Sequence, residues 1–156
     1  MSNPEKSNTE RIFEKHIKGT PSKAIVRDLT IKYCTLTNEV QRVCNLEVTA
    51  VHITTKVMKK HYDKRPAEEN DFIITNGWQI VHLPELIYRN KDAKRGGFLF
   101  ARRLKNELYV SAIEVVNSDD SQMVYVVSQF RIRKGKEGYL EGYELMWSWK
   151  GGAPSS

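Results

Sequence analysis

Hydrophobic residues recur at helical spacing in the first half of the chain and at alternate positions in the second half. Residues 9–18 place Ile12, Phe13 and Ile17 on one side of a helix, and Gly19 follows as a stop signal. We therefore expect a short amphipathic helix near the N-terminus.

The segment from residue 24 to residue 53 gives a weaker pattern. Residues 24–29 predict a short helix, whereas residues 30–36 alternate without a clear preference for helix or strand. Thr37 or Asn38 can cap another helix, after which the β-branched residues of segment 48–53 predict a strand. That strand leads directly into the most basic helix of the chain.

This basic helix is predicted to have about ten residues. Thr54 or Thr55 can cap it, and Pro66 cannot continue it. Three of its lysines recur every four residues and form one stripe: Lys56, Lys60 and Lys64.

His61 lies between this lysine stripe and the apolar side of the helix, which carries Val57 and Met58. Partial burial and the positive charges of neighbours such as Lys59 both disfavour imidazolium. His61 is therefore predicted to be neutral and able to act as a base near neutral pH. The alternative is a helix whose lysines are solvated and whose histidine only packs.

Residues 68–71 are acidic and predict a loop, and residues 78–83 predict a short helix that Pro84 ends. Extended chain follows at residues 86–88. From residue 97 onward the period is two, which predicts four strands separated by short polar links, over residues 98–104, 108–116, 123–133 and 139–149.

Short links of turn-forming residues favour antiparallel hairpins. Helices come first and strands second, which is typical of an α+β fold rather than of parallel βαβ units. We expect N-terminal helices packed on an antiparallel sheet of about four strands.

The bulk composition narrows the class of protein. A chain of 156 residues predicts one domain, over residues 9–150, between a disordered N-terminus (1–8) and a flexible tail (151–156). The formal net charge of +6 favours an acidic partner, either nucleic acid or an anionic membrane surface. Two cysteines without a metal-site spacing fit a reducing compartment, and no apolar run is long enough to span a bilayer. These features predict a cytoplasmic protein without a membrane partner.

The third predicted strand combines a hydroxyl with basic and aromatic residues. Strict alternation would place Ser128, Phe130 and Ile132 on one face with Val124 and Val126, and the arginines on the other. Cations that neutralise phosphate and aromatic rings that stack on bases are typical of single-stranded RNA recognition. The cations that we expect to contact RNA in this half are Arg102, Arg131 and Arg133.

Several enzyme classes have no support. The chain has no phosphate-binding glycine-rich loop, no HExxH, no CxxC and no GxSxG. RNA carries its own nucleophile in the 2′-hydroxyl, so a ribonuclease needs only an acid, a base and cations on the phosphate. We therefore expect neither a metal nor a cofactor.

Four short segments resemble one nuclease group. They are VHI at 51–53 leading to KKH at 59–61, LPELIY at 83–88, FLFARR at 98–103 and VVSQFR at 126–131. Their order is similar to that in the phage-associated nuclease domains grouped with barnase, EndoU, colicin D and RelE. The resemblance covers roughly residues 40–149 and implies a strongly curved antiparallel sheet and metal-independent cleavage of RNA, often transfer RNA.

Carried over to this chain, the resemblance gives His61 and Lys60 catalytic roles and matches Ser128 and Phe130 to a serine and an aromatic on a late strand. A lysine of the colicin D-like members falls on Met58 here, so Lys59 or Lys56 would have to supply that charge.

The implied reaction is transesterification to a 2′,3′-cyclic phosphate and a 5′-hydroxyl end. His61 would move the proton, Lys60, Lys59 and Arg131 would offset the phosphorane charge, and Ser128 would orient the phosphate or ribose. His52 is a second candidate for the proton carrier. A toxin-like nuclease of this kind can also have an inhibitor protein as partner. The competing interpretation is a non-catalytic RNA-binding or phage structural module that uses the same basic surface.

Overall fold

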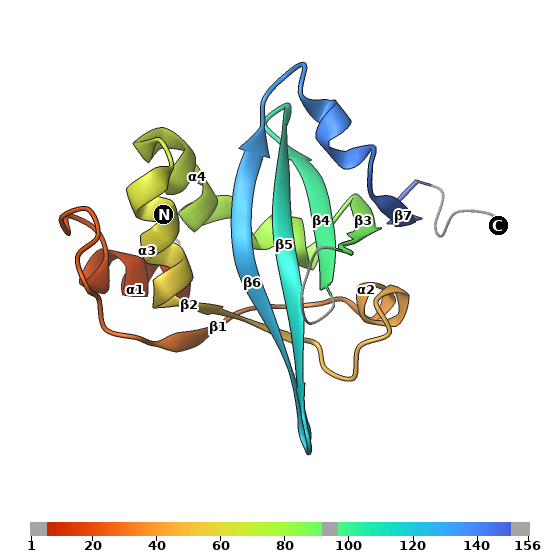
Figure 1. The fold of residues 1–156 in the computed structure, drawn as a ribbon, viewed down its shortest axis with the longest axis horizontal. Helices are drawn as coiled ribbons and strands as arrows, with labels where there is room; N and C mark the ends of the chain where they lie inside the picture. Colours follow the sequence, from red (N-terminus) through yellow and green to blue (C-terminus); the bar gives the residue numbers. More distant parts are fainter. Residues whose placement is uncertain (1–5, 92–96, 151–156) are drawn as a thin grey trace, which may run out of the picture.

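In the computed structural model, seven strands form one sheet in the order β1-β2-β6-β5-β4-β3-β7 (Figure 1). The structure describes residues 6–91 and 97–150, except for the side chain of Glu137. The strands are β1 (Thr30–Thr35), β2 (Ala50–Thr54), β3 (Leu86–Arg89), β4 (Gly97–Leu104), β5 (Glu107–Ser118), β6 (Ser121–Ile132) and β7 (Glu144–Ser148). The helices are α1 (Asn8–His16), α2 (Asn38–Val43), α3 (Thr55–Lys64), α4 (Ala67–Asn76) and α5 (Trp78–His82), followed by the 3₁₀ helix η1 (Glu137–Leu140).

The predicted α+β class is confirmed, but the prediction of about four antiparallel strands is wrong. β2 and β6 run parallel, so the sheet is mixed, and the other described pairs are antiparallel. The additional strands β1, β2 and β3 have only four to six residues each. Such short segments carry too few alternating positions to show that they join the sheet.

Three local predictions also need correction. The acidic residues near position 68 are not in a loop: they form the first turn of α4, where negative charge suits the positive end of the helix dipole. Residues 24–29 are not helical, because Leu29 exchanges hydrogen bonds with the backbone N–H and the hydroxyl of Thr55 at the start of α3. Segment 139–149 is not one strand but the end of η1, a turn and β7.

The basic helix is confirmed as α3, with Thr54 as its N-cap and Arg65 as its C-cap. The predicted flexible ends lie mostly outside the described residues. Of the first eight residues, Ser7 caps α1 and Lys6 forms an ion pair with Glu14 at 2.6 Å.

The two faces of the sheet differ in what covers them. On one face the larger core packs against the helices and includes Phe13, Met58, Ile80 and Val126. Figure 1 shows α1, α3 and α4 gathered on the same side of the long β5–β6 hairpin. A smaller core on the other face involves Leu99, Val110 and Ile132 of the sheet, with Leu140 of η1 as the buried cover. We call this second face the open face.

A β-bulge changes the predicted alternation of β6. Ser128 pairs with Ala112 and Val126 with Ile113, so Val127 is an additional residue on the β6 side. Val124 and Val126 therefore belong to the helix-covered core, whereas Phe130 packs on the open-face core. The predicted common face for these residues is wrong, because an inserted residue reverses the orientation of every side chain that follows.

A buried polar cluster joins the sheet to the helices behind the bulge. The side-chain amide nitrogen of Gln129 has three acceptors within reach of its two protons: Ser111 Oγ at 2.8 Å, the Tyr33 hydroxyl at 3.0 Å and the Gly77 carbonyl at 3.3 Å. Gln129 is 2% exposed, so these partners offset the cost of burying its amide.

Candidate functional site

Among the described residues, the second half of β6 has no neighbouring strand on one side. β2 pairs with β6 only at Val124 and Tyr125 before the chain turns into α3. The backbone groups of β6 beyond the bulge would therefore be unpaired and would need other partners.

Side chains from α3, its C-cap and α4 supply these partners. The backbone N–H of Gln129 donates to His61 Nε2 at 3.3 Å, and Arg65 Nε donates to the Gln129 carbonyl at 3.3 Å. The backbone N–H of Arg131 donates to Glu69 Oε2 at 3.5 Å. His61, Arg65 and Glu69 thus provide hydrogen-bond partners for three backbone groups at this strand edge, and we call them the edge residues.

His61 is buried, with 6% of its surface exposed. Burial, followed by the positive charges of Arg65 and Lys60, lowers the pKa of His61 to about 4. The imidazole is therefore neutral at pH 7, as the sequence predicted. Its Nε2 lone pair is already used by the Gln129 N–H, so a role as general base would require this hydrogen bond to open.

The lysines of α3 have different environments. Lys59 is buried, and its ammonium donates to Thr20 Oγ1 at 2.9 Å, to the Pro21 carbonyl at 2.7 Å and to Asp63 Oδ1 at 2.7 Å. The hydrogen bond from Lys59 lowers the pKa of the Asp63 carboxyl, and one from the backbone N–H of Lys23 adds to it. All three ammonium protons of Lys59 have partners within the fold. Lys56 and Lys60 are exposed.

Ser128 comes close to this edge from the open face. Its hydroxyl lies 3.5 Å from an Arg65 guanidinium nitrogen. Arg131 points toward carboxylates, with its Nε 3.1 Å from Glu107 Oε2 and 3.8 Å from Glu69 Oε1. The structure therefore brings His61 and Ser128 to the same stretch of β6, with Arg65 and Arg131 beside them.

Other predicted residues lie elsewhere. His52 is on β2, and its ring lies 6.2 Å from the Tyr125 ring, centroid to centroid, at a tilt of 53°. Arg102 on β4 donates to the Leu83 carbonyl at 2.8 Å. Arg133 follows the end of β6 and is exposed.

Aromatic side chains form a row on the open face beside Ser128. The Phe130 ring meets the Tyr139 ring edge-on at 5.5 Å, and the Tyr139 and Tyr143 rings are 5.9 Å apart. Tyr139 is 49% exposed and Trp149, further along the same side, is 56% exposed. We call Phe130, Tyr139 and Tyr143 the aromatic row.

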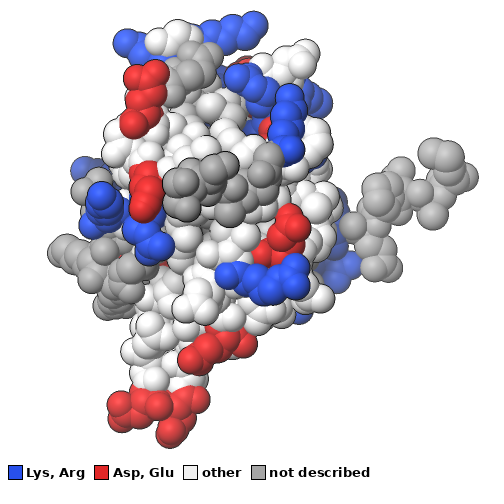
Figure 2. Space-filling model, turned by 90° about the vertical axis from the view of Figure 1, so that its right-hand side faces the viewer, with Lys and Arg blue, Asp and Glu red and all other residues white. Residues whose placement is uncertain are grey.

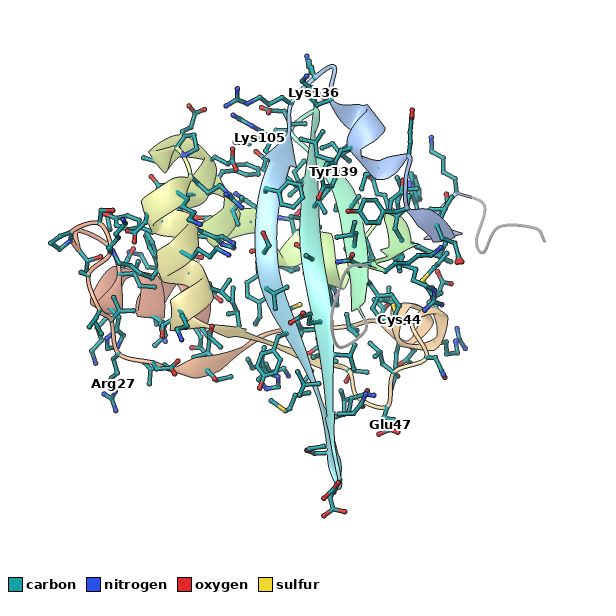
Figure 3. All side chains as sticks on the ribbon, viewed as in Figure 1. Arg27, Cys44, Glu47, Lys105, Lys136 and Tyr139 are labelled. Carbon is teal, nitrogen blue, oxygen red and sulfur yellow. The ribbon has the colours of Figure 1, made fainter. Side chains whose placement is uncertain are left out.

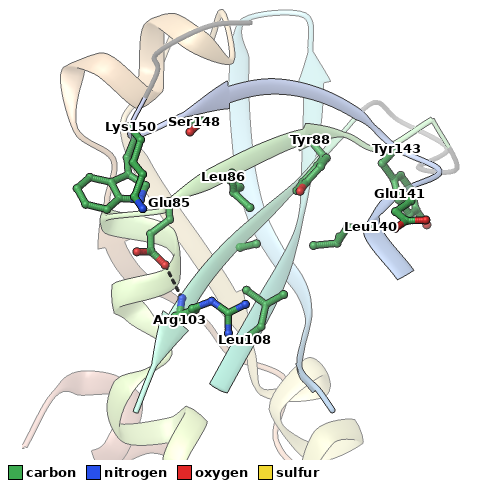
Figure 4. Close-up of a pocket in the computed structure, with 12 residues that line it drawn as sticks. Glu85, Leu86, Tyr88, Arg103, Leu108, Leu140, Glu141, Tyr143, Ser148 and Lys150 are labelled. Atoms are coloured by element: carbon green, nitrogen blue, oxygen red, sulfur yellow. Dashed lines mark hydrogen bonds between the residues drawn. The ribbon is translucent and has the colours of Figure 1, made fainter. Parts of the chain in front are cut away.

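A cavity of about 590 Å³ opens next to the aromatic row (Figure 4). It is open to solvent, and residues of β3, β4, β5, η1 and the end of β7 line it. Its polar and aromatic lining includes Glu85, Tyr88, Arg103, Tyr143, Trp149 and Lys150. The sequence predicted a contact with RNA for Arg102 but not for Arg103. Neighbouring residues of a strand point to opposite faces, and it is Arg103 that lines the cavity.

Charge is unevenly distributed along the β5–β6 hairpin. Its tip carries Asp119 and Asp120, whereas exposed cations gather at the other end, where the β4–β5 turn and the β6–η1 loop meet. Figure 3 labels Lys105 and Lys136 at this end, near Tyr139, and Figure 2 shows acidic side chains at the opposite tip. The exposed cations of this basic end are Lys105, Arg133, Lys134 and Lys136.

The part of the chain that the structure describes contains neither a candidate metal site nor a membrane-spanning helix. Within residues 6–91 and 97–150, no three His, Cys, Asp or Glu side chains form a group that could hold a metal ion. No helix in these ranges is long and apolar enough to cross a membrane.

Comparison with known proteins adds no relative: no family model, curated protein or solved structure matches the chain. The resemblance to the barnase, EndoU, colicin D and RelE group therefore stays a prediction.

Proposed function

We propose that this chain binds single-stranded RNA on the open face, with the phosphates directed toward the basic end. The observation that carries the proposal is the aromatic row of Phe130, Tyr139 and Tyr143 on the sheet face that the α-helices leave uncovered and on which η1 packs. Unpaired bases stack on such rings, and every base offers a π-face.

The basic end supplies the second requirement, which is neutralisation of phosphate. Among the described side chains, no carboxylate forms an ion pair with Arg133, Lys134 or Lys136. The acidic tip of the hairpin repels the same ligand, so the charge distribution favours one end of the open face.

Binding is favoured over cleavage because of the state of His61. A general base must have a lone pair within reach of the proton that it removes. The Nε2 lone pair of His61 accepts the Gln129 N–H, and the imidazole is 6% exposed.

Fluorescence anisotropy with a labelled single-stranded RNA of about 12 nucleotides tests the proposal. The double substitution Arg133→Glu and Lys136→Glu should weaken binding. It should also reduce the slope of log affinity against log salt by about one for each cation that contacts a phosphate.

The matched control carries Arg11→Glu and Lys15→Glu, which make the same charge change on the exposed surface of α1. Its affinity should stay within about twofold of the wild type, apart from the long-range effect of net charge. Equal weakening by both variants, or no binding by the wild type, would contradict the proposal.

Endoribonuclease activity is a second candidate function. The hydroxyl of Ser128 lies 3.5 Å from the Arg65 guanidinium, beside His61 and Phe130. RNA that crosses the open face would therefore pass a cation and a hydroxyl, and the buried imidazole of His61, which is hydrogen-bonded to the next residue Gln129, would have to become accessible to it. In this case His61 would move the proton, Lys60 would add positive charge, and the product would be a 2′,3′-cyclic phosphate.

Incubation with total transfer RNA in EDTA tests cleavage. If the chain is a nuclease, EDTA-resistant fragments with cyclic phosphate ends should appear, and His61→Gln should slow their formation about 10² to 10⁴-fold. Glutamine keeps an acceptor for the Gln129 N–H, so RNA binding should persist in the variant. Intact RNA with the wild type, under conditions where the same RNA is bound, would leave binding alone, and an inhibitor protein would then have no activity to block.

A further inference from the structure

The cavity beside the aromatic row combines one fixed carboxylate with aromatic rings and cations. Glu85 lies just before β3, and its Oε1 accepts the backbone N–H of Arg103 at 2.6 Å. The backbone N–H of Trp149 donates to the backbone carbonyl of Glu85 at 2.9 Å, and the exposed Trp149 side chain lines the same cavity. Figure 4 shows Glu85 at one end of the cavity and Tyr88 and Tyr143 at the other.

The Glu85 carboxylate is therefore oriented before any ligand arrives. One oxygen is engaged by Arg103, and among the described residues no hydrogen bond to the second oxygen occurs. An ionised carboxylate only accepts hydrogen bonds. The group that it fits in the cavity is a donor, such as the exocyclic amino group of a nucleobase.

The rest of the lining suits a nucleotide. A volume of about 590 Å³ lies within the range of pockets for small ligands. Rings at both ends provide stacking surfaces for bases. Arg103 and Lys150 are exposed at the rim, where they can neutralise a phosphate.

We propose that this cavity binds a nucleotide of single-stranded RNA whose base carries an amino group, and that Glu85 accepts a hydrogen bond from that group. The inference rests on the proposed RNA binding and adds a base preference to it. Cytosine and uracil provide the sharpest comparison. Cytosine has an amino donor at position 4, where uracil has a carbonyl acceptor.

The test compares the affinities of labelled oligocytidylate and oligouridylate of equal length by fluorescence anisotropy. The wild type should bind oligocytidylate at least about fivefold more tightly, since one good base contact is worth that much discrimination. In Glu85→Gln the amide oxygen can keep the Arg103 N–H, which leaves the NH₂ group to face the ligand. The preference should therefore disappear or reverse toward oligouridylate.

Glu141→Gln is the matched control, because Glu141 also lines the cavity but is exposed and lies at the end opposite Glu85 (Figure 4). It should leave the cytidine to uridine ratio unchanged. Trp149→Ala should weaken binding of both oligonucleotides without removing the preference. Circular dichroism of each variant checks that the fold is retained.

The outcomes separate this inference from the function on which it rests. Equal wild-type affinity for the two oligonucleotides, or a ratio that Glu85→Gln does not change, would overturn the base preference while RNA binding stands. Absence of binding to either oligonucleotide would overturn both.

Discussion

His61 acts in this fold as a substitute for a missing strand neighbour. Its Nε2 accepts the Gln129 N–H at the free edge of β6, next to Arg65, which binds the carbonyl of the same residue. A buried N–H without a partner would cost about 1–3 kcal/mol. The imidazole therefore has a structural role whether or not it takes part in chemistry.

The lowered pKa of His61 predicts a loss of stability in mild acid. The ordinary pKa of histidine is about 6.5, and burial lowers that of His61 to about 4. The unfolded chain therefore binds this proton first, so the contribution of His61 is complete above pH 6.5 and decreases as the pH falls toward 4. Between pH 7 and pH 4 the free energy of unfolding should fall by about 3 kcal/mol through this group.

Urea unfolding of the wild type and of His61→Gln at several pH values measures this effect. The variant keeps an acceptor but has no titrating ring, so its loss between pH 7 and pH 4 should be smaller by that amount. Parallel pH profiles for the two proteins would mean that His61 does not resist protonation in the folded state.

The sequence predicted the surroundings of His61 but not those of Lys59 or Arg65. Helical spacing correctly indicated that His61 borders an apolar surface and is neutral. The burial of Lys59 could not be predicted, because its partners Thr20 and Pro21 are distant in sequence and Asp63 alone suggests a surface pair. Arg65 was missed because it directly precedes Pro66, which pointed only to the end of a helix.

Single elements were predicted best where their caps and periods were clear. α2 and α3 follow their threonine caps, and α5 ends before Pro84 as expected. The bulge at Val127 could not be located, because both β6 faces carry apolar residues and alternation alone gives no sign of an inserted residue. The partly open edge of β6 depends on the short β2 pairing, which is a property of the tertiary fold.

The junction of α4 and α5 packs tightly against the buried polar cluster. A Cβ on Gly77 would lie 2.6 Å from both the Ile73 carbonyl oxygen and the Tyr33 hydroxyl, and 3.0 Å from Gln129 Nε2. Alanine usually favours a helix over glycine by about 1 kcal/mol. Here the clash should dominate, and Gly77→Ala should reduce the free energy of unfolding by about 1–3 kcal/mol.

Thermal or urea unfolding of Gly77→Ala and Gly142→Ala gives a direct comparison. A Cβ on Gly142 would meet no atom within 4 Å, so that variant should match the wild type. A Gly77→Ala protein as stable as the wild type would show that the junction can move away from the cluster at little cost.

At the scale of the whole molecule, the fold separates a helix-covered face from an open one and an acidic tip from a basic end. Composition indicated an acidic partner through the net charge of +6. It did not indicate where the cations gather, because Arg133, Lys136 and the β4–β5 turn are brought together only by sheet topology. The cavity was equally beyond prediction, since β3, β4, β5, η1 and β7 line it jointly.

The most direct test of RNA binding on the open face is an NMR titration of isotopically labelled protein with a short single-stranded RNA. We expect shifts of the Phe130, Tyr139 and Tyr143 ring signals and of the Arg133 and Lys136 amides, with α1 and β1 unchanged. Shifts confined to the helix-covered side, or no shifts at RNA concentrations well above that of the protein, would contradict it.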